Sequence, residues 1–336
     1  MRYFAILIFL LATFGVHAQE WEDHQTFGPQ NPTRTLRILS STDTSFFIPI
    51  INSFTAQRPN IGVDYFVTGT STLDEVFRSD PDRFDVVISS AMDLQLKLAN
   101  DGLAARLDSI SHLEWAQWRS SLFAFTTEPA AIVINNKAFA GLPVPATRQD
   151  LIEVLRENPE IFLGKVGTYD VRQSGLGYLF ATQDARASET FWRLMEVIGS
   201  LDAQLYCCSA DMIDDLTTGR ILVAYNVLES YALARPETAD LLTVILPSEF
   251  PTTMMRSALV SKKASEPALA EAFVKHLIQL QSVGGQQDFP LPPLGAFQDI
   301  TGRASISLEP ALMTYLDTLK RQTFIREWES AIIQDR

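Results

Sequence analysis

The chain has 336 residues, of which 46% are hydrophobic and 20% charged, and its formal net charge is −13. This composition is that of a globular protein, and the length favours two domains. The acidic balance disfavours nucleic acid and anionic membrane surfaces as partners. It does not exclude a small anionic ligand, because binding in a closed cleft depends on the groups that line it and not on the overall charge.

Residues 1–18 form a distinct N-terminal segment. Arg2 is followed by an apolar run over 3–14 and by Val16-His17-Ala18, which resembles a small-x-small cleavage site. The run is short for a membrane span, so the pattern predicts a secretory signal peptide over 1–18 and a periplasmic protein. An uncleaved N-terminal anchor is the alternative. Because no cysteine follows the apolar run directly, we do not expect a lipoprotein.

Three times in the first hundred residues, an apolar run ends in a hydroxyl-rich loop that leads into a helical pattern. The predicted strands are 35–39, 61–67 and 84–88, and the helices that follow are 46–54, 73–79 and 94–100. In a parallel α/β sheet these loops share the carboxyl edge, where ligands bind. One such loop is usually a helix cap, but three together predict a polar binding site. Its candidate residues are Ser40, Ser41, Thr42, Thr68, Gly69, Thr70, Ser89 and Ser90.

The stretch 167–181, GTYDVRQSGLGYLFA, has the same arrangement of strand end, polar turn and helix start. Its candidates are Tyr169, Arg172, Ser174 and Gly175. Unpaired N–H groups and the macrodipole at a helix start attract anions, and an arginine supplies a fixed fork for a carboxylate or phosphate. The alternative is an ordinary turn capped by Ser174.

Further along the chain, a strand at 221–226 runs into a loop with Asn226 and Glu229, a fifth candidate ligand-facing edge. The extended run 123–139 suits a crossover between lobes, and the prolines after the strand at 242–246 mark a second one. Helices are expected over 103–122, 266–280 and most of 310–333.

The motifs of common enzymes and metal sites are missing from the sequence. Ser174 lacks the G-x-S-x-G frame, and no candidate loop contains a histidine to activate a serine, so we do not expect an enzyme. Cys207 and Cys208 are adjacent, and a strained vicinal disulfide and two free thiols are both open. Without a second cysteine pair, zinc and other metal cofactors are not expected.

The order of these motifs resembles a known family. LRILSSTDTSFFIPIINSFTAQRPNIGVDY, FDVVISSAMDLQLKLANDG, AAIVINNKAF, GKVGTYDVRQSGLGYLFA and GRILVAYNVLESYA together look like a periplasmic solute-binding protein of the type II class. Within that class the chain is similar to the branch of ABC importers that contains ferric-ion, phosphosugar and phosphoglycerate binding proteins. The resemblance covers essentially all of the chain after the signal peptide.

The resemblance implies a two-lobed α/β fold with two crossing strands as the hinge. The implied lobes are 34–128 plus 247–300 and 129–246, with C-terminal helices over 301–336. It also implies a monomer that passes its solute to an inner-membrane ABC permease. The alternative is a ligand sensor that signals to a membrane sensor kinase.

The ligand expected from the resemblance is a small anion. Ferric-binding members carry two adjacent tyrosines where this chain has Tyr225 and Tyr231 six positions apart, so iron is the alternative. Hydroxyls, backbone N–H groups and Arg172 suit a phosphate ester or a carboxylate. Glu229 would accept hydrogen bonds from ligand hydroxyls, which favours a sugar phosphate or phosphoglycerate, and no cofactor is expected.

Overall fold

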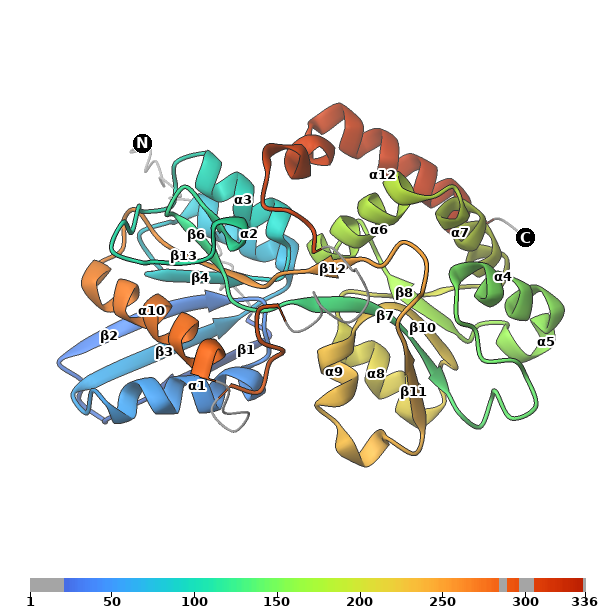
Figure 1. Ribbon diagram of the computed structural model, residues 1–336, viewed down its shortest axis with the longest axis horizontal. Coiled ribbons are helices and arrows are strands. Elements are labelled where there is room, and N and C mark those ends of the chain that lie inside the picture. The colour runs from blue at the N-terminus through green and yellow to red at the C-terminus, as the bar shows by residue number, and fades with distance from the viewer. Residues whose placement is uncertain (1–20, 284–288, 296–304, 335–336) are drawn as a thin grey trace, which may run out of the picture.

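The computed structural model describes residues 21–283, 289–295 and 305–334, and the predicted signal peptide lies outside these ranges. Two α/β lobes lie side by side, each with its own sheet, and β7 and the segment around β12 run between them (Figure 1). The predicted two-lobed α/β architecture is confirmed. Within the described ranges, no helix is both long enough and apolar enough to cross a membrane.

The first lobe contains a sheet of order β1-β3-β2-β4-β13-β6-β5, in which β2 pairs in parallel with β3 and β4. Helices α1, α2 and α3 each follow one of these parallel strands, as the sequence predicts. The strands are β1 (Asp23–Phe27), β2 (Arg34–Ser40), β3 (Ile61–Val67), β4 (Val86–Ser89), β5 (Gln117–Trp118), β6 (Leu122–Ala124) and β13 (Ser257–Val260). The helices are α1 (Thr44–Ala56), α2 (Thr70–Ser79), α3 (Met92–Asn100), η1 (Glu114–Ala116) and α10 (Pro267–Val283).

The second lobe contains a sheet of order β11-β7-β10-β8-β9, in which β8 pairs in parallel with β9 and β10. Its strands are β7 (Glu128–Asn135), β8 (Val166–Tyr169), β9 (Gln204–Tyr206), β10 (Val223–Leu228) and β11 (Leu242–Ile245). Its helices are α4 (Arg148–Glu157), α5 (Pro159–Phe162), α6 (Gly175–Ala187), α7 (Thr190–Ser200), α8 (Ser209–Thr218), α9 (Glu229–Leu233) and η2 (Pro236–Thr238).

Paired extended segments connect the lobes. β6 of the first sheet leads into β7 of the second, and β12 (Thr253–Met254) pairs antiparallel with β7 before the chain returns to β13. The C-terminal part contacts both lobes, since η3 (Pro310–Leu316) packs on α3 while α12 (Thr318–Ile332) packs on α7 (Figure 1). The predicted domain limits stay a prediction.

β7 separates two hydrophobic cores, and its buried residues alternate between them. Ala131 and Val133 belong to the larger core, which extends through the first lobe, whereas Ile132 and Ile134 belong to the core under α4, α7 and α12. Every residue of β7 is buried, which is typical of a central strand covered on both faces. The strand that forms the hinge is therefore held firmly on the side of the second lobe.

The structure differs from the sequence analysis in two places. Residues 23–27, for which no strand is predicted, form β1, an edge strand that pairs antiparallel with β3. The helix expected over 103–122 is wrong, because this segment holds only the short η1 and the two-residue β5 within irregular chain. It follows the surface of the first lobe and is fixed by contacts such as the bridge between Ala104 and Ser261, which helical spacing does not encode.

Candidate ligand-binding cleft

A cavity lies between the lobes, at the carboxyl ends of the parallel strands. One wall comes from the loops after β2, β3 and β4, and the other from the ends of β8, β9 and β10. Ligands of open α/β sheets bind at this edge. The lining residues are Glu22, Ser41, Asp43, Thr68, Gly69, Thr70, Ser90, Tyr169, Ser174, Leu176, Cys207, Cys208, Ser209, Leu228 and Tyr231.

Seven of the residues predicted to bind ligand line this cavity: Ser41, Thr68, Gly69, Thr70, Ser90, Tyr169 and Ser174. Three more predicted residues are buried beside it and organise the loops. Ser40 Oγ accepts hydrogen bonds from Tyr65 Oη (2.7 Å) and from the N–H of Thr42 (3.0 Å), and Ser41 Oγ bonds to Ser89 Oγ (3.2 Å). The first-lobe loops therefore come together as the sequence predicts, and the ligand contacts themselves stay a prediction.

The other four predicted residues lie outside the described lining of the cavity. Arg172 donates two hydrogen bonds to Asp170 (2.7 and 2.8 Å) and one to Glu329 on α12 (3.3 Å). Its guanidinium is thereby engaged with α12 and not with the cleft. Asn226 has a left-handed backbone (φ 66°) and donates to Asp184 (2.9 Å) inside the second lobe. Glu229 begins α9, and Gly175 begins α6 at the contact between the lobes.

Four helices begin at the cavity: α1 after Asp43, α2 after Gly69, α6 after Ser174 and α8 after Cys208. Ser174 Oγ accepts a hydrogen bond from the N–H of Gly177 (3.0 Å), so α6 is capped by its own side chain. No side chain caps α1, α2 or α8 in this way within the described chain. The positive dipole ends of these three helices therefore act on the contents of the cleft.

The lobes touch across the cleft. Thr70 Oγ1 of the first lobe accepts a hydrogen bond from the N–H of Leu176 of the second (3.1 Å), and the rings of Phe46 and Tyr231 meet at 5.0 Å between centroids. Only about 40 Å³ of the cavity is open to water. This volume is far below that of a typical small-molecule site, so the conformation is a closed one.

Two carboxylates line the cavity on the side of the first lobe. Burial raises the pKa of Glu22, and the negative charges of Asp43 and Asp211 raise it further. Burial also raises the pKa of Asp43, which Arg256 lowers in part. An ionised carboxylate only accepts hydrogen bonds, so hydroxyl or N–H donors of a ligand would stabilise the charged form of both.

A buried ion pair lies at the hinge, below the first-lobe loops. Arg256 Nη2 is 2.9 Å from Glu128 Oε2, and both side chains are fully buried. Arg256 also donates to Thr42 Oγ1 of the first lobe, while Ser230 of the second lobe donates to Glu128 (2.5 Å). Burial disfavours the charged form of Glu128, but Arg256 outweighs that effect and lowers its pKa. The pair thus connects both lobes to the crossing strands.

The structure is similar to that of the substrate-binding protein of an ABC transporter from Agrobacterium tumefaciens. The two are 28% identical, with a TM-score of 0.86, over 92% of this chain and 98% of that one. The chain has the two-lobed fold of type II periplasmic solute-binding proteins. Its structural neighbours are substrate-binding proteins and not enzymes.

Structures with lower sequence identity also share the fold of this chain. The periplasmic binding protein AfuA from Actinobacillus pleuropneumoniae, with fructose-6-phosphate bound, is 14% identical with a TM-score of 0.73 over 90% of this chain and 100% of that one. Iron-bound HitA from Pseudomonas aeruginosa is 16% identical with a TM-score of 0.63 over 88% and 99% of the two chains. No family model and no curated protein matches the sequence.

The sequence analysis missed several residues that line the cavity. Cys207 and Cys208 follow β9 and Ser209 begins α8, so they obey the same strand–loop–helix rule that identified the other loops. The shortness of β9 concealed that signal. Glu22 reaches the cavity only because β1 pairs with β3, a long-range contact without a local signature.

Proposed function

We propose that the protein is the periplasmic, monomeric substrate-binding component of an ABC importer and binds a small hydroxylated anion, such as a sugar phosphate. The observation that supports this most is the convergence of four helix N-termini on one cavity. Three of them have no side-chain cap, so their N–H groups suit a phosphate or carboxylate. This arrangement supplies the donors that the sequence analysis attributed to Arg172.

The two carboxylates of the cavity favour a ligand that carries hydroxyl groups at the end opposite its anionic group. Glu22 and Asp43 would repel an anionic group placed beside them but accept hydrogen bonds from hydroxyls. An anionic head at the uncapped N-terminus of α8, with hydroxyls toward Glu22 and Asp43, satisfies both sets of groups. A sugar phosphate has these two ends, whereas inorganic phosphate has only the first.

The cycle that follows from this assignment is a hinge motion. The cavity is too small to hold a sugar phosphate, so the lobes must separate about β7 and β12 to admit it and, with it bound, close less far than they do here. Contacts that need both walls exist only in the closed form, and a ligand that makes them shifts the population toward that form. The permease would then distinguish loaded from empty protein by the lobe arrangement.

Ferric ion is the second candidate. Tyr169 and Tyr231 line the cavity together with Glu22 and Asp43, and these are oxygen donors of the kind that a hard cation prefers. Against iron, burial raises the pKa of both tyrosines, and Tyr169 Oη is bonded to Ser209 Oγ (2.5 Å). Iron would have to displace that bond and ionise buried phenols.

Thermal unfolding of the purified protein, after removal of co-purified solute, tests the proposal. The panel contains sugar phosphates, sugar acids, the corresponding neutral sugars, inorganic phosphate and ferric citrate. A ligand at 100 times its Kd stabilises by about 2.7 kcal/mol, which raises the midpoint by several degrees. A shift with sugar phosphates that exceeds those with neutral sugars and with inorganic phosphate supports the proposal. A shift with ferric citrate alone supports iron.

The substitution Glu22→Gln tests which end of the proposed ligand lies beside Glu22. The substitution removes a negative charge but keeps an acceptor of the same size, so it should strengthen binding of inorganic phosphate and leave sugar phosphates equal or weaker. Asp64→Asn, a change to a half-buried carboxylate of β3 outside the described lining, is the control. If Glu22→Gln strengthens both ligands equally, the hydroxyls do not face Glu22.

A further inference from the structure

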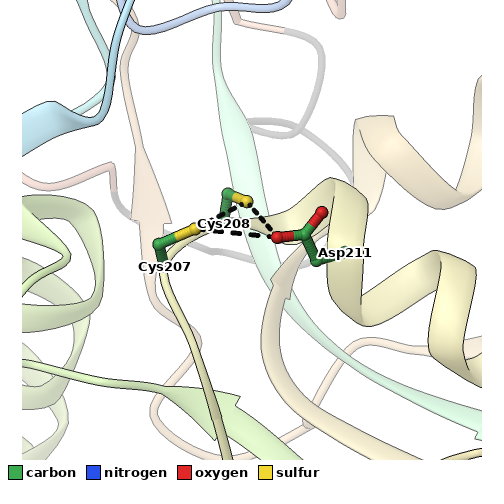
Figure 2. Close-up of side chains that lie close together, drawn as sticks. All are labelled: Cys207, Cys208 and Asp211. Atoms are coloured by element: carbon green, nitrogen blue, oxygen red, sulfur yellow. Dashed lines mark hydrogen bonds between the residues drawn. The ribbon is translucent and has the colours of Figure 1, made fainter. Parts of the chain in front are cut away.

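Cys207, Cys208 and Asp211 come together where β9 ends and α8 begins. The two Sγ atoms are 3.0 Å apart, and Asp211 Oδ2 lies 3.0 Å from Cys208 Sγ and 3.7 Å from Cys207 Sγ. Figure 2 shows both sulfurs directed toward the same carboxylate oxygen. The cysteines are free thiols, and one ligand atom from each of the three residues lies within 4.8 Å of the others.

We propose that this cluster binds a thiophilic divalent cation, with Zn²⁺ as the reference ion. Two sulfurs and a carboxylate oxygen are donors that zinc accepts in tetrahedral sites, at about 2.3 Å for sulfur and about 2.0–2.2 Å for oxygen. In a tetrahedral site such donor atoms are about 3.6–3.8 Å apart. The two sulfurs and the carboxylate oxygen, now 3.0 to 3.7 Å apart, would therefore separate by less than about 1 Å to hold the ion. Both thiols lose their protons on binding, so two protons are released for each M²⁺ bound.

The surroundings of the cluster favour a cation that remains accessible. Cys207 is exposed and Cys208 half-buried, so an ion can enter without unfolding of the chain. Cys207 and Cys208 also line the interlobe cavity, on the wall that faces Glu22 and Asp43. With three protein ligands, a tetrahedral ion keeps one position for water or for another oxygen donor. That position would open toward the cleft.

The spacing of the ligands explains why the sequence did not predict this site. Adjacent cysteines without a second pair do not form a recognised zinc motif. The first turn of α8 adds Asp211 to them, three residues after Cys208, and so supplies the third donor. The cluster shares the start of α8 with the anionic end of the proposed solute, but a sugar phosphate would use backbone N–H groups there and not the ligand atoms of the metal.

Cadmium binding to the reduced full-length protein tests the site directly. Cd²⁺ bound to thiolates gives an ultraviolet charge-transfer absorption, and Zn²⁺ affinity can be measured by competition with a chromophoric chelator. We expect one Cd²⁺ per chain with this absorption. The double variant Cys207→Ser, Cys208→Ser should lose the absorption and bind Zn²⁺ at least about 100-fold more weakly, and Asp211→Asn about 10-fold more weakly while it keeps the absorption.

Asp214→Asn is the matched control, because Asp214 lies on the same helix and pairs with Arg235 outside the cluster. It should bind both metals like the unmodified protein. The inference is overturned if the reduced protein gives no cadmium–thiolate absorption, or if the double serine variant still binds Zn²⁺ with full affinity. Binding of sugar phosphates is measured on the same double variant, so that a failure of the metal site is not confused with a failure of the proposed solute.

Discussion

Two fully paired arginines, Arg148 and Arg256, are buried in different parts of the molecule. Arg148 pairs with Asp184 and Arg256 with Glu128, both at 2.9 Å and with side chains at most 3% exposed. Among the described residues, Asp184 is bonded only to groups of the second lobe and of the chain that leaves it, whereas the Arg256 pair contacts both lobes at the hinge. The Arg148 pair therefore holds the second lobe together, whereas the Arg256 pair holds the two lobes relative to each other.

The comparison shows that burial alone does not reveal what an ion pair is for. A buried pair adds little net stability over apolar packing, but loss of one partner leaves an uncompensated charge. The cost of truncation should therefore be similar at the two sites. The effect on solute binding should differ, because only the hinge pair supports the loops that line the cleft.

Truncation of either arginine should have the largest effect. We expect Arg256→Ala and Arg148→Ala each to lower the free energy of unfolding by about 3–5 kcal/mol, since Glu128 or Asp184 is left buried without its cation. Urea denaturation measures this cost. In calorimetric titrations at a temperature where both variants are folded, Arg256→Ala should bind solute at least about 10-fold more weakly, and Arg148→Ala within about threefold of the unmodified protein. Equal losses of affinity would remove the distinction between the two pairs.

A buried carboxylate without an ion-pair partner contributes to stability with a pH dependence opposite to that of the paired Glu128. Asp93 lies in the first turn of α3, and in the described chain no lysine or arginine forms an ion pair with it. Burial raises its pKa to about 7, although the charge of Arg321 lowers it in part. Because the folded-state pKa lies above the unfolded value, Asp93 contributes full stability below about pH 4 and loses it as the pH rises toward 7. Glu128, whose pKa is lowered, contributes stability above its unfolded pKa and loses it in acid.

Asp93→Asn should therefore stabilise the protein at pH 8, by about 1–3 kcal/mol, because it removes a charge that burial penalises. At pH 4 the same substitution should change the free energy of unfolding by less than about 0.5 kcal/mol. Urea denaturation at the two pH values checks this. Glu128→Gln is the contrasting variant and should destabilise at pH 8. A destabilised Asp93→Asn at pH 8 would mean that the carboxylate has a cationic partner when it ionises.

Substitutions at Gly175 test how closely the two lobes must approach each other for the solute to bind. A Cβ at this position would lie 2.9 Å from Leu94 Cδ1 and 3.1 Å from Thr70 Oγ1, both on the other lobe. Gly175→Ala should weaken solute binding about fivefold, by about 1 kcal/mol, because the lobes cannot close fully. Stability should not fall, since alanine favours a helix. Gly175→Val should weaken binding further, and an unchanged Kd in both variants would show that this contact yields without cost.

Much of the fold could be predicted because its signals are local. Apolar runs such as 61–67, each followed by a hydroxyl-rich loop and a helical pattern, fix the parallel strands and the edge at which ligand binds. β1 has no such signal: its sequence, DHQTF, is polar because only one edge of it pairs with the sheet. The segment 103–122 has helical composition in part, but tertiary contacts with the first lobe decide its path.

Prediction of the cleft was limited by contacts between distant residues. Position after a strand places Ser41, Thr70 and Ser174 at the cavity, and this much follows from spacing. Side-chain direction does not follow: Arg172 lies in the correct loop, yet Asp170 and Glu329 hold its guanidinium toward α12. Arg256 pairs with a residue 128 positions away, which no spacing rule identifies.

The smallest predicted effects come from two helix caps that differ in location. Ser174 Oγ caps α6 at the cavity, and Thr147 Oγ1 caps α4 by accepting from the N–H of Asp150 (2.9 Å), away from the described lining of the cleft. Ser174→Ala and Thr147→Ala should each cost about 1 kcal/mol of stability. Only Ser174→Ala should also change solute affinity, by about two- to fivefold, because the start of α6 forms part of the cavity wall. If Thr147→Ala changes affinity as much, the binding loss reflects a general loosening of the second lobe, and the cavity wall has no separate role.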